Sequence, residues 1–103
     1  MIDGRTVMAG AKAQALGLIA EERMRQDELQ AEGRFRFTCA DDGLSNAEKF
    51  AILSEEVGEV AREVLTQPER VLASDTTGSR EGLRKEVTQV AAICAAWIES
   101  LLD

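Results

Sequence analysis

The chain of 103 residues contains no histidine. This absence excludes His-dependent catalytic triads, histidine general bases and His-ligated zinc sites. There are only two cysteines, Cys39 and Cys94, and they lack the CxxC spacing of metal and redox motifs. We therefore expect reduced thiols in a cytoplasmic protein, with Cys94 as a small core residue.

Proline, tyrosine and long apolar runs are also scarce. Pro68 is the single proline, and there is no tyrosine. No apolar run approaches the length of a membrane span, and the N-terminal stretch is too interrupted by polar residues for a signal peptide. Alanine, leucine, valine and glutamate dominate instead, which predicts an all-α fold. The length predicts one domain covering residues 1–103.

The net charge is −7, and no block of basic residues offsets it. A nucleic acid is therefore not expected as a direct partner, because binding its phosphates requires a basic surface. A nucleotide remains compatible with this charge, since a metal ion can bridge acidic side chains to phosphate.

Local signals divide the chain into a helical bundle of three main helices. Residues 1–10 are expected to be a flexible lead-in, and Gly33 to end the first helix. Ser45 and Glu48 form a capping box at the start of the second helix. Ser79 is the expected N-cap of the third helix, after an irregular connection. The helices are predicted at about 11–32, from the Ser45 cap to about 65 or 66, and at about 80–102.

Two polar segments leave alternatives open. The run from Glu21 to Glu28 is most simply a solvated face with ion pairs, although Arg23, Arg25 or Gln26 could instead reach a ligand. The loop at 33–43 carries Phe35 and Phe37. The favoured interpretation is that these rings pin the loop against the core, and the alternative is a lid or base-contacting loop over a site.

The third helix is apolar on nearly all sides. Its main apolar stripe consists of Leu83, Val87, Val90, Cys94, Trp97 and Leu101. Neighbouring apolar residues extend this stripe around the helix, namely Ala91, Ala92, Ala95, Ala96 and Ile98. Such a helix is not expected on the surface of a small monomer. We therefore expect homo-oligomerisation to complete the bundle, with a tetramer favoured over a dimer.

The second helix carries a line of glutamates beside its apolar stripe. Glu56, Glu59 and Glu63 share this line, and Glu55 lies at its edge. Ile52 projects along the same line, which indicates that another element covers it in part. Buried like charges are costly unless a cation neutralises them, so the pattern favours a metal site.

The third helix offers a matching half-site. Glu86 and Gln89 lie one turn apart on a line that continues into Ile93 and Trp97. Facing helices that carry such pairs can converge oxygen ligands on one point. Glu56, Glu59, Glu86 and Gln89 are hard oxygen donors, which suit Mg²⁺ or Mn²⁺.

Residues 55–59 (EEVGE) and 86–89 (EVTQ) resemble the EExxE…ExxD signature of the MazG-like all-α nucleotide pyrophosphohydrolases. The similarity runs from about residue 19 to 102 and is greatest to short bacterial and phage members. It implies hydrolysis of nucleoside triphosphates to monophosphate and pyrophosphate. By this resemblance Glu56, Glu59 and Glu86 bind Mg²⁺, and Glu55 holds a second metal or activates the attacking water. Gln89 stands where the family has Asp, which removes one negative charge from the site.

Residues for the rest of the substrate carry a weaker signal. Lys49, Arg84 and Lys85 could meet phosphate, but each is individually expected more often as a surface charge. Trp97 is expected in the core or at a subunit interface, with base stacking as the alternative. The other hypotheses are a non-catalytic helical oligomer that binds nucleotide or protein, and a structural bundle with solvated glutamates. The apolar Ile52 and Ile93 on the acidic lines argue against the structural bundle.

Overall fold

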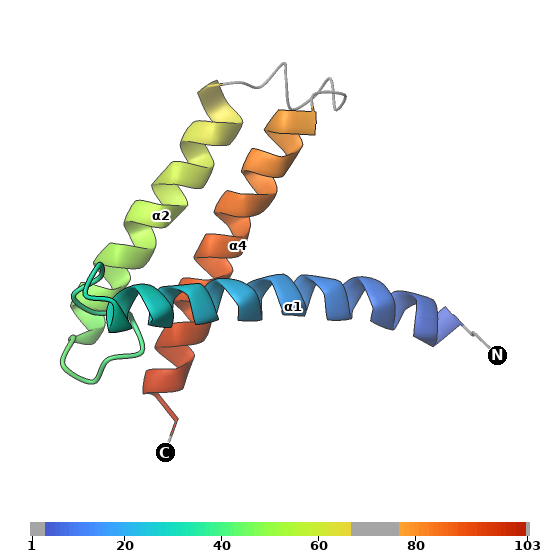
Figure 1. Ribbon diagram of the computed structural model, residues 1–103. Coiled ribbons are helices and arrows are strands. Elements are labelled where there is room, and N and C mark those ends of the chain that lie inside the picture. The colour runs from blue at the N-terminus through green and yellow to red at the C-terminus, as the bar shows by residue number, and fades with distance from the viewer. Residues whose placement is uncertain (1–3, 67–76, 103) are drawn as a thin grey trace.

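The computed structural model describes residues 4–66 and 77–102, and all regular structure in these residues is helical. The helices are α1 (Gly4–Ala31), α2 (Asn46–Thr66) and α4 (Thr77–Ser100). In Figure 1, α2 and α4 lie side by side as a hairpin, and α1 crosses the end of that hairpin near the C-terminus. α4 packs against both other helices. The all-α class predicted from composition is confirmed.

Helix ends follow local chemistry where the sequence signals are strong. Gly33 adopts a φ of 78°, and the amide of Arg34 donates to the Leu29 carbonyl at 2.8 Å, which closes a Schellman motif. Ser45 Oγ accepts from the Glu48 amide at 3.1 Å, while Glu48 Oε1 accepts from the Ser45 amide at 2.9 Å. The predicted helix stop and the predicted capping box are therefore both confirmed.

Two helix starts differ from prediction. α1 begins at Gly4, so the expected lead-in is helical from that residue onward. α4 begins at Thr77, so Ser79 lies inside the helix and is not its N-cap. Each glycine in a helix costs only about 1 kcal/mol, so Gly10 weakens α1 without ending it. The expected connection before α4 falls mainly on residues 67–76, outside the described part of the chain.

The hydrophobic core is small. Its buried members are Cys39, Ala92, Ile93 and Ala96, with Ala40, Ile52, Leu53 and Trp97 packed partly buried against them. Cys94, expected in the core, is only half-buried. Among the described residues, no large side chain is fully buried. A core of this size stabilises one copy weakly.

Polar contacts attach α1 to the hairpin and the loop to α1. Arg23 Nε and Nη2 donate to the two carboxylate oxygens of Glu99 at 2.7 and 2.9 Å, which joins α1 to the end of α4. Asp41 Oδ2 accepts from Gln30 Nε2 at 2.9 Å and from the Thr38 amide at 3.1 Å, which fixes the loop against α1. These contacts place the loop and α1 around one side of the hairpin.

Candidate functional site

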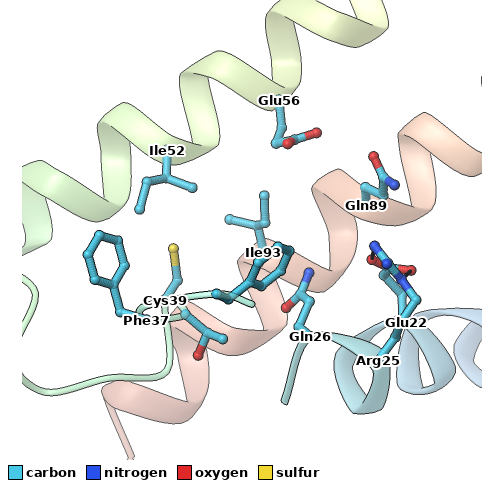
Figure 2. Close-up of a pocket in the computed structure, with 11 residues that line it drawn as sticks. Glu22, Arg25, Gln26, Phe37, Cys39, Ile52, Glu56, Gln89 and Ile93 are labelled. Atoms are coloured by element: carbon cyan, nitrogen blue, oxygen red, sulfur yellow. Dashed lines mark hydrogen bonds and ion pairs between the residues drawn. The ribbon is translucent and has the colours of Figure 1, made fainter. Parts of the chain in front are cut away.

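A cleft of about 440 Å³ lies where α1, the loop, α2 and α4 meet (Figure 2). This volume lies in the range of small-molecule sites. One end of the cleft is polar and is lined by Glu22, Arg25, Glu56 and Gln89. The other end is lined mainly by the apolar groups Phe35, Phe37, Cys39, Ile52 and Ile93. The two ends offer different chemistry to a single ligand.

Glu56 is the electrostatic focus of the polar end. Burial raises its pKa, and the nearby carboxylates of Glu86, Glu59, Glu55 and Glu22 raise it further. Repulsion of this kind arises only where negative groups lie close together in a partly desolvated place. Negative charge is therefore concentrated around Glu56 at the polar end.

The predicted metal ligands have different positions in this structure. Glu56 and Gln89 line the cleft, and Glu86 is half-buried near Glu56. Glu59 and the proposed catalytic residue Glu55 are exposed and lie outside the lining. Within residues 4–66 and 77–102, no three His, Cys, Asp or Glu side chains are grouped closely enough to hold a metal ion. The expected convergence of all four ligands is not present as a ready-made coordination shell.

A second cavity, of about 410 Å³, adjoins the first between α1 and α4. Glu22 and Arg25 line both cavities, and Arg25 Nη2 donates to Glu22 Oε2 at 2.8 Å. Arg84 and Lys85 line the second cavity from α4. Three predicted substrate-binding cations, Arg25, Arg84 and Lys85, thus line the same cavity, together with Glu21, Glu22 and Glu81.

Lys49 and Trp97 lie outside both of these cavities. Lys49 is only 3% exposed, so the expectation that it is a surface charge is wrong. Trp97 packs against the core, and its Nε1 donates to Asn46 Oδ1 at 3.0 Å. This contact ties α4 to the start of α2, and it favours the core role for Trp97 over base stacking.

The apolar end is formed largely by the loop. Phe35 and Phe37 are 38% and 45% exposed, and both line the cleft. They are therefore not buried in the core, and the alternative of a loop covering a site describes them better. Cys39 beneath them is buried, and burial raises the pKa of its thiol, so it contributes a neutral wall.

Three residues of the cleft lie in the polar run that was expected to be a solvated face, and only Arg25 among them is exposed. Glu22 lines the cleft with its side chain 14% exposed, and Gln26 lines it with 8% exposure. Arg23 in the same run is 7% exposed, so the solvated-face prediction is wrong for Glu22, Arg23 and Gln26. The i,i+4 spacing of Glu22 and Gln26 placed them on one helix line, but nothing local showed that this line was covered.

Comparisons of this chain with protein-family models, with curated proteins and with solved structures found no match. Among the described helices, none has the length and apolar character needed to cross a membrane. The resemblance of the acidic signature to the MazG-like enzymes therefore remains a prediction from the sequence.

Proposed function

We propose that the chain is a Mg²⁺-dependent nucleoside triphosphate pyrophosphohydrolase that converts an NTP or dNTP and water to the monophosphate and pyrophosphate. The observation that carries the proposal is a cleft with an apolar end and a polar end bearing Glu22, Glu56 and Arg25, next to a second cavity lined by Arg84 and Lys85. A nucleotide presents the same order of chemistry: an aromatic base, a sugar and a chain of charged phosphates. House-cleaning of nucleotide pools in the cytoplasm is the corresponding cellular use.

The donor set fits a hard divalent cation. Glu56, Glu59, Glu86 and Gln89 would hold Mg²⁺, with Mn²⁺ as a substitute, because all four supply oxygen. The exposed side chain of Glu59 can change rotamer to reach an ion beside Glu56. When bound, the metal neutralises phosphate charge and lowers the pKa of a bound water.

The chain's own residues supply the remaining chemistry. Phe35, Phe37 and Ile93 form the wall against which a base can stack, and they exclude water from it. Arg25 can exchange its contact with Glu22 for a phosphate oxygen, with Arg84 and Lys85 beside it. Glu55 orients the attacking water and accepts its proton.

The alternative is a catalytically weakened or inactive MazG-like oligomer that binds nucleotide or protein. Gln89 favours it, because the amide removes one negative charge from the ligand set. Its test is Gln89→Asp: in a weakened site the added carboxylate tightens Mg²⁺ binding measured by calorimetry. Unchanged Mg²⁺ affinity would contradict this alternative.

Association of copies of this chain is part of the same proposal, with a tetramer favoured over a dimer. The helix hairpin exposes large apolar side chains, which we call the apolar face. Phe50 and Leu65 on α2 are 61% and 72% exposed, and Ile98 on α4 is 57% exposed. The apolar face consists of Phe50, Val57, Leu65, Val87, Ile98 and Leu101. Burying these side chains against a second copy would compensate for the small core.

The direct test identifies the products. The protein is incubated with Mg²⁺ and a panel of NTPs and dNTPs, and the products are separated by ion chromatography. The proposal predicts nucleoside monophosphate and pyrophosphate in equal amounts. Release of orthophosphate with nucleoside diphosphate would contradict it, as would the absence of any product across the whole panel.

A further inference from the structure

Gln26 is a buried amide in the cleft that the proposed chemistry does not yet use. It is 8% exposed and lies one turn beyond Glu22 on α1, toward the loop that carries the aromatic rings. In Figure 2 its amide nitrogen points to the side of the cleft where Glu56 and Gln89 lie. Gln26 therefore presents a hydrogen-bond donor to the polar end from the middle of the cleft.

The orientation of this amide is fixed by Arg23. Arg23 Nη1 donates to Gln26 Oε1 at 3.1 Å. A guanidinium group has only donors, so the amide turns its oxygen to Arg23 and its nitrogen away. Arg23 is itself held, because its Nε and Nη2 donate to Glu99 at 2.7 and 2.9 Å. The direction of the NH₂ group is thus set by a buried contact and not by solvent.

The NH₂ group has no acceptor of its own. Within residues 4–66 and 77–102, nothing accepts a hydrogen bond from Gln26 Nε2. A buried donor without a partner is unfavourable, so this nitrogen indicates a ligand that brings an acceptor atom. A cation does not meet this need, because an amide NH₂ group only donates. A water bound to Mg²⁺ does not meet it either, because the ion turns the hydrogens of that water outward.

A phosphate oxygen has the required chemistry. It is an anionic acceptor, and hydrogen bonds to charged oxygens are shorter and stronger than those between neutral groups. A phosphate can approach the carboxylate of Glu56 only when a divalent cation lies between them, which is the arrangement of the proposed metal site. The same phosphate can then bind the cation with one oxygen and Gln26 with another.

The order of the groups along the cleft identifies the phosphate. From the loop toward the start of α1, the cleft is lined first by apolar groups, then by Gln26, and then by Glu22 and Arg25. A nucleotide whose base lies at the apolar end has its α-phosphate next in this order, because that phosphate is bonded to the sugar. The β- and γ-phosphates then lie toward Arg25.

We propose that Gln26 binds an α-phosphate oxygen of the substrate through its side-chain NH₂ group. The inference rests on the proposed function, because it takes the base at the apolar end and a metal ion at Glu56. The bond that is hydrolysed lies between the α- and β-phosphates. The contact therefore holds the substrate directly beside the reacting group.

Binding without turnover tests this contact. The ligands are the α,β-imido analogues of the four common dNTPs, in which NH replaces the oxygen between the α- and β-phosphates, and the four matching monophosphates. Calorimetry measures the Kd of each ligand at saturating Mg²⁺. A separate titration measures the Kd of Mg²⁺ without nucleotide. The base that the wild type binds most tightly is then used for the variants.

Gln26→Met removes the donor and nearly keeps the volume of the side chain. It is expected to weaken binding of the analogue and of the monophosphate about tenfold each, as loss of a hydrogen bond to a charged group predicts. The Kd of Mg²⁺ without nucleotide is expected to stay within about twofold, because Gln26 does not ligate the ion. Gln14→Met on the exposed part of α1 is the control and keeps every wild-type Kd.

Gln26→Glu reverses the chemistry of the group that faces the polar end. It keeps one oxygen for Arg23, so the contact that orients the side chain is preserved and the fold is retained. Its second oxygen adds a carboxylate near Glu56, which is expected to tighten Mg²⁺ binding without nucleotide. The same oxygen repels the α-phosphate, so the analogue should bind more weakly than to Gln26→Met. Thermal unfolding verifies that each variant is folded, and Gln26→Glu decides alone if Gln26→Met is not.

The results separate this inference from the proposed function. If the variants bind the analogue as tightly as wild type, or if Gln26→Met weakens Mg²⁺ binding without nucleotide, the phosphate contact is wrong and the enzyme assignment stands. A loss for the triphosphate analogue without a loss for the monophosphate would overturn the assignment to the α-phosphate. If the wild type hydrolyses dNTPs but binds no analogue, an unchanged kcat/KM in Gln26→Met overturns the contact. If it neither binds analogues nor hydrolyses dNTPs, the proposed function fails and this inference with it.

Discussion

Arg23 links parts of the chain that are 76 residues apart in the sequence. Its guanidinium contacts Glu99, Gln26 and Asp27, and its side chain is only 8% exposed. A lysine at this position could carry the charge but could not form the two-pronged contact with Glu99. The position of α1 on the hairpin thus depends on one side chain that the sequence presented as part of a polar surface.

Arg23→Lys should therefore destabilise the fold. We expect the free energy of unfolding to fall by about 2 kcal/mol, because the bidentate hydrogen bond from the buried side chain to Glu99 is lost. The loss is limited because the Glu99 carboxylate keeps partial access to water. Urea unfolding followed by circular dichroism measures the change. Arg34→Lys is the control, because its 3.9 Å contact with Glu32 is exposed and should contribute little. Equal stability of the two variants would refute the anchoring role of Arg23.

The same pair predicts how stability depends on pH. The hydrogen bonds from Arg23 hold the pKa of Glu99 below its ordinary value. A lowered carboxyl pKa contributes stability above the ordinary glutamate pKa of roughly 4.3, and this contribution is lost as pH falls through the folded-state pKa. Wild type should lose this contribution below about pH 4, whereas Glu99→Gln should lack it at neutral pH. The free energy of unfolding of wild type and of Glu99→Gln is measured as a function of pH. A difference between the two proteins that stays the same at every pH would contradict this linkage.

Residue-scale prediction from sequence succeeded where the determining contacts are local. The Gly33 stop and the Ser45–Glu48 box involve residues within a few positions of each other, so spacing alone specifies them. The burial of Gln26 and Lys49 depends on elements far away in the sequence. Periodicity places a residue on a helix face, but it does not say which faces another element covers.

At the scale of elements, the second helix was predicted to within a residue because a capping box precedes it and Pro68 follows it. The starts of α1 and α4 were placed too late, since glycine and serine were treated as boundaries. Within a helix these residues lower stability modestly but do not terminate the hydrogen-bond ladder. The prediction therefore overestimated how far glycine and serine oppose a helix.

Gly58 provides a test at this scale. A Cβ built at Gly58 meets no other atom within 4 Å, so neither close helix packing nor a tight fit explains this glycine within one copy. Gly58→Ala should raise the free energy of unfolding by about 1 kcal/mol through helix propensity. Gly33→Ala should lower it, because residue 33 has a φ of 78°. Chemical denaturation of both variants measures the two signs, and destabilisation by Gly58→Ala would point to a partner or ligand close to that position.

At the scale of the whole molecule, the small core and the exposed apolar face have the same origin, because many apolar residues of the hairpin are not buried within one copy. The line predicted as the main stripe of the third helix includes Val87 and Leu101, which are 49% and 62% exposed. The smaller Ala92 and Ala96 are buried instead. The helix is apolar on two sides, and only one of them is used within the copy described here.

Val87→Lys should shift the protein to a smaller assembly. Placing a charge at the centre of a buried apolar contact opposes association, whereas it is tolerated on a free surface. Sedimentation equilibrium would show a larger species for wild type than for the variant, and Glu28→Lys on α1 would remain like wild type. A monomeric wild type would contradict the proposed assembly.

The arrangement of the cleft was the least predictable feature of the molecule. The sequence supplied Glu56, Glu86 and Gln89, whose spacing lies within two helices. It did not supply the crossing of α1 over the hairpin, which brings Glu22 and Gln26 to the same cavity. That crossing is held by the Arg23–Glu99 contact, whose partners are 76 residues apart in the sequence.

Mg²⁺-dependent pyrophosphate release by wild type and Glu56→Gln tests the central claim most directly. Removing this carboxylate relieves the burial and repulsion that raise the pKa of Glu56, so the variant should be at least as stable as wild type. Loss of activity would then reflect the lost metal ligand rather than unfolding. We expect a fall of at least about 100-fold in kcat/KM, with Glu28→Gln unchanged. Equal pyrophosphate release by wild type and Glu56→Gln would contradict the account.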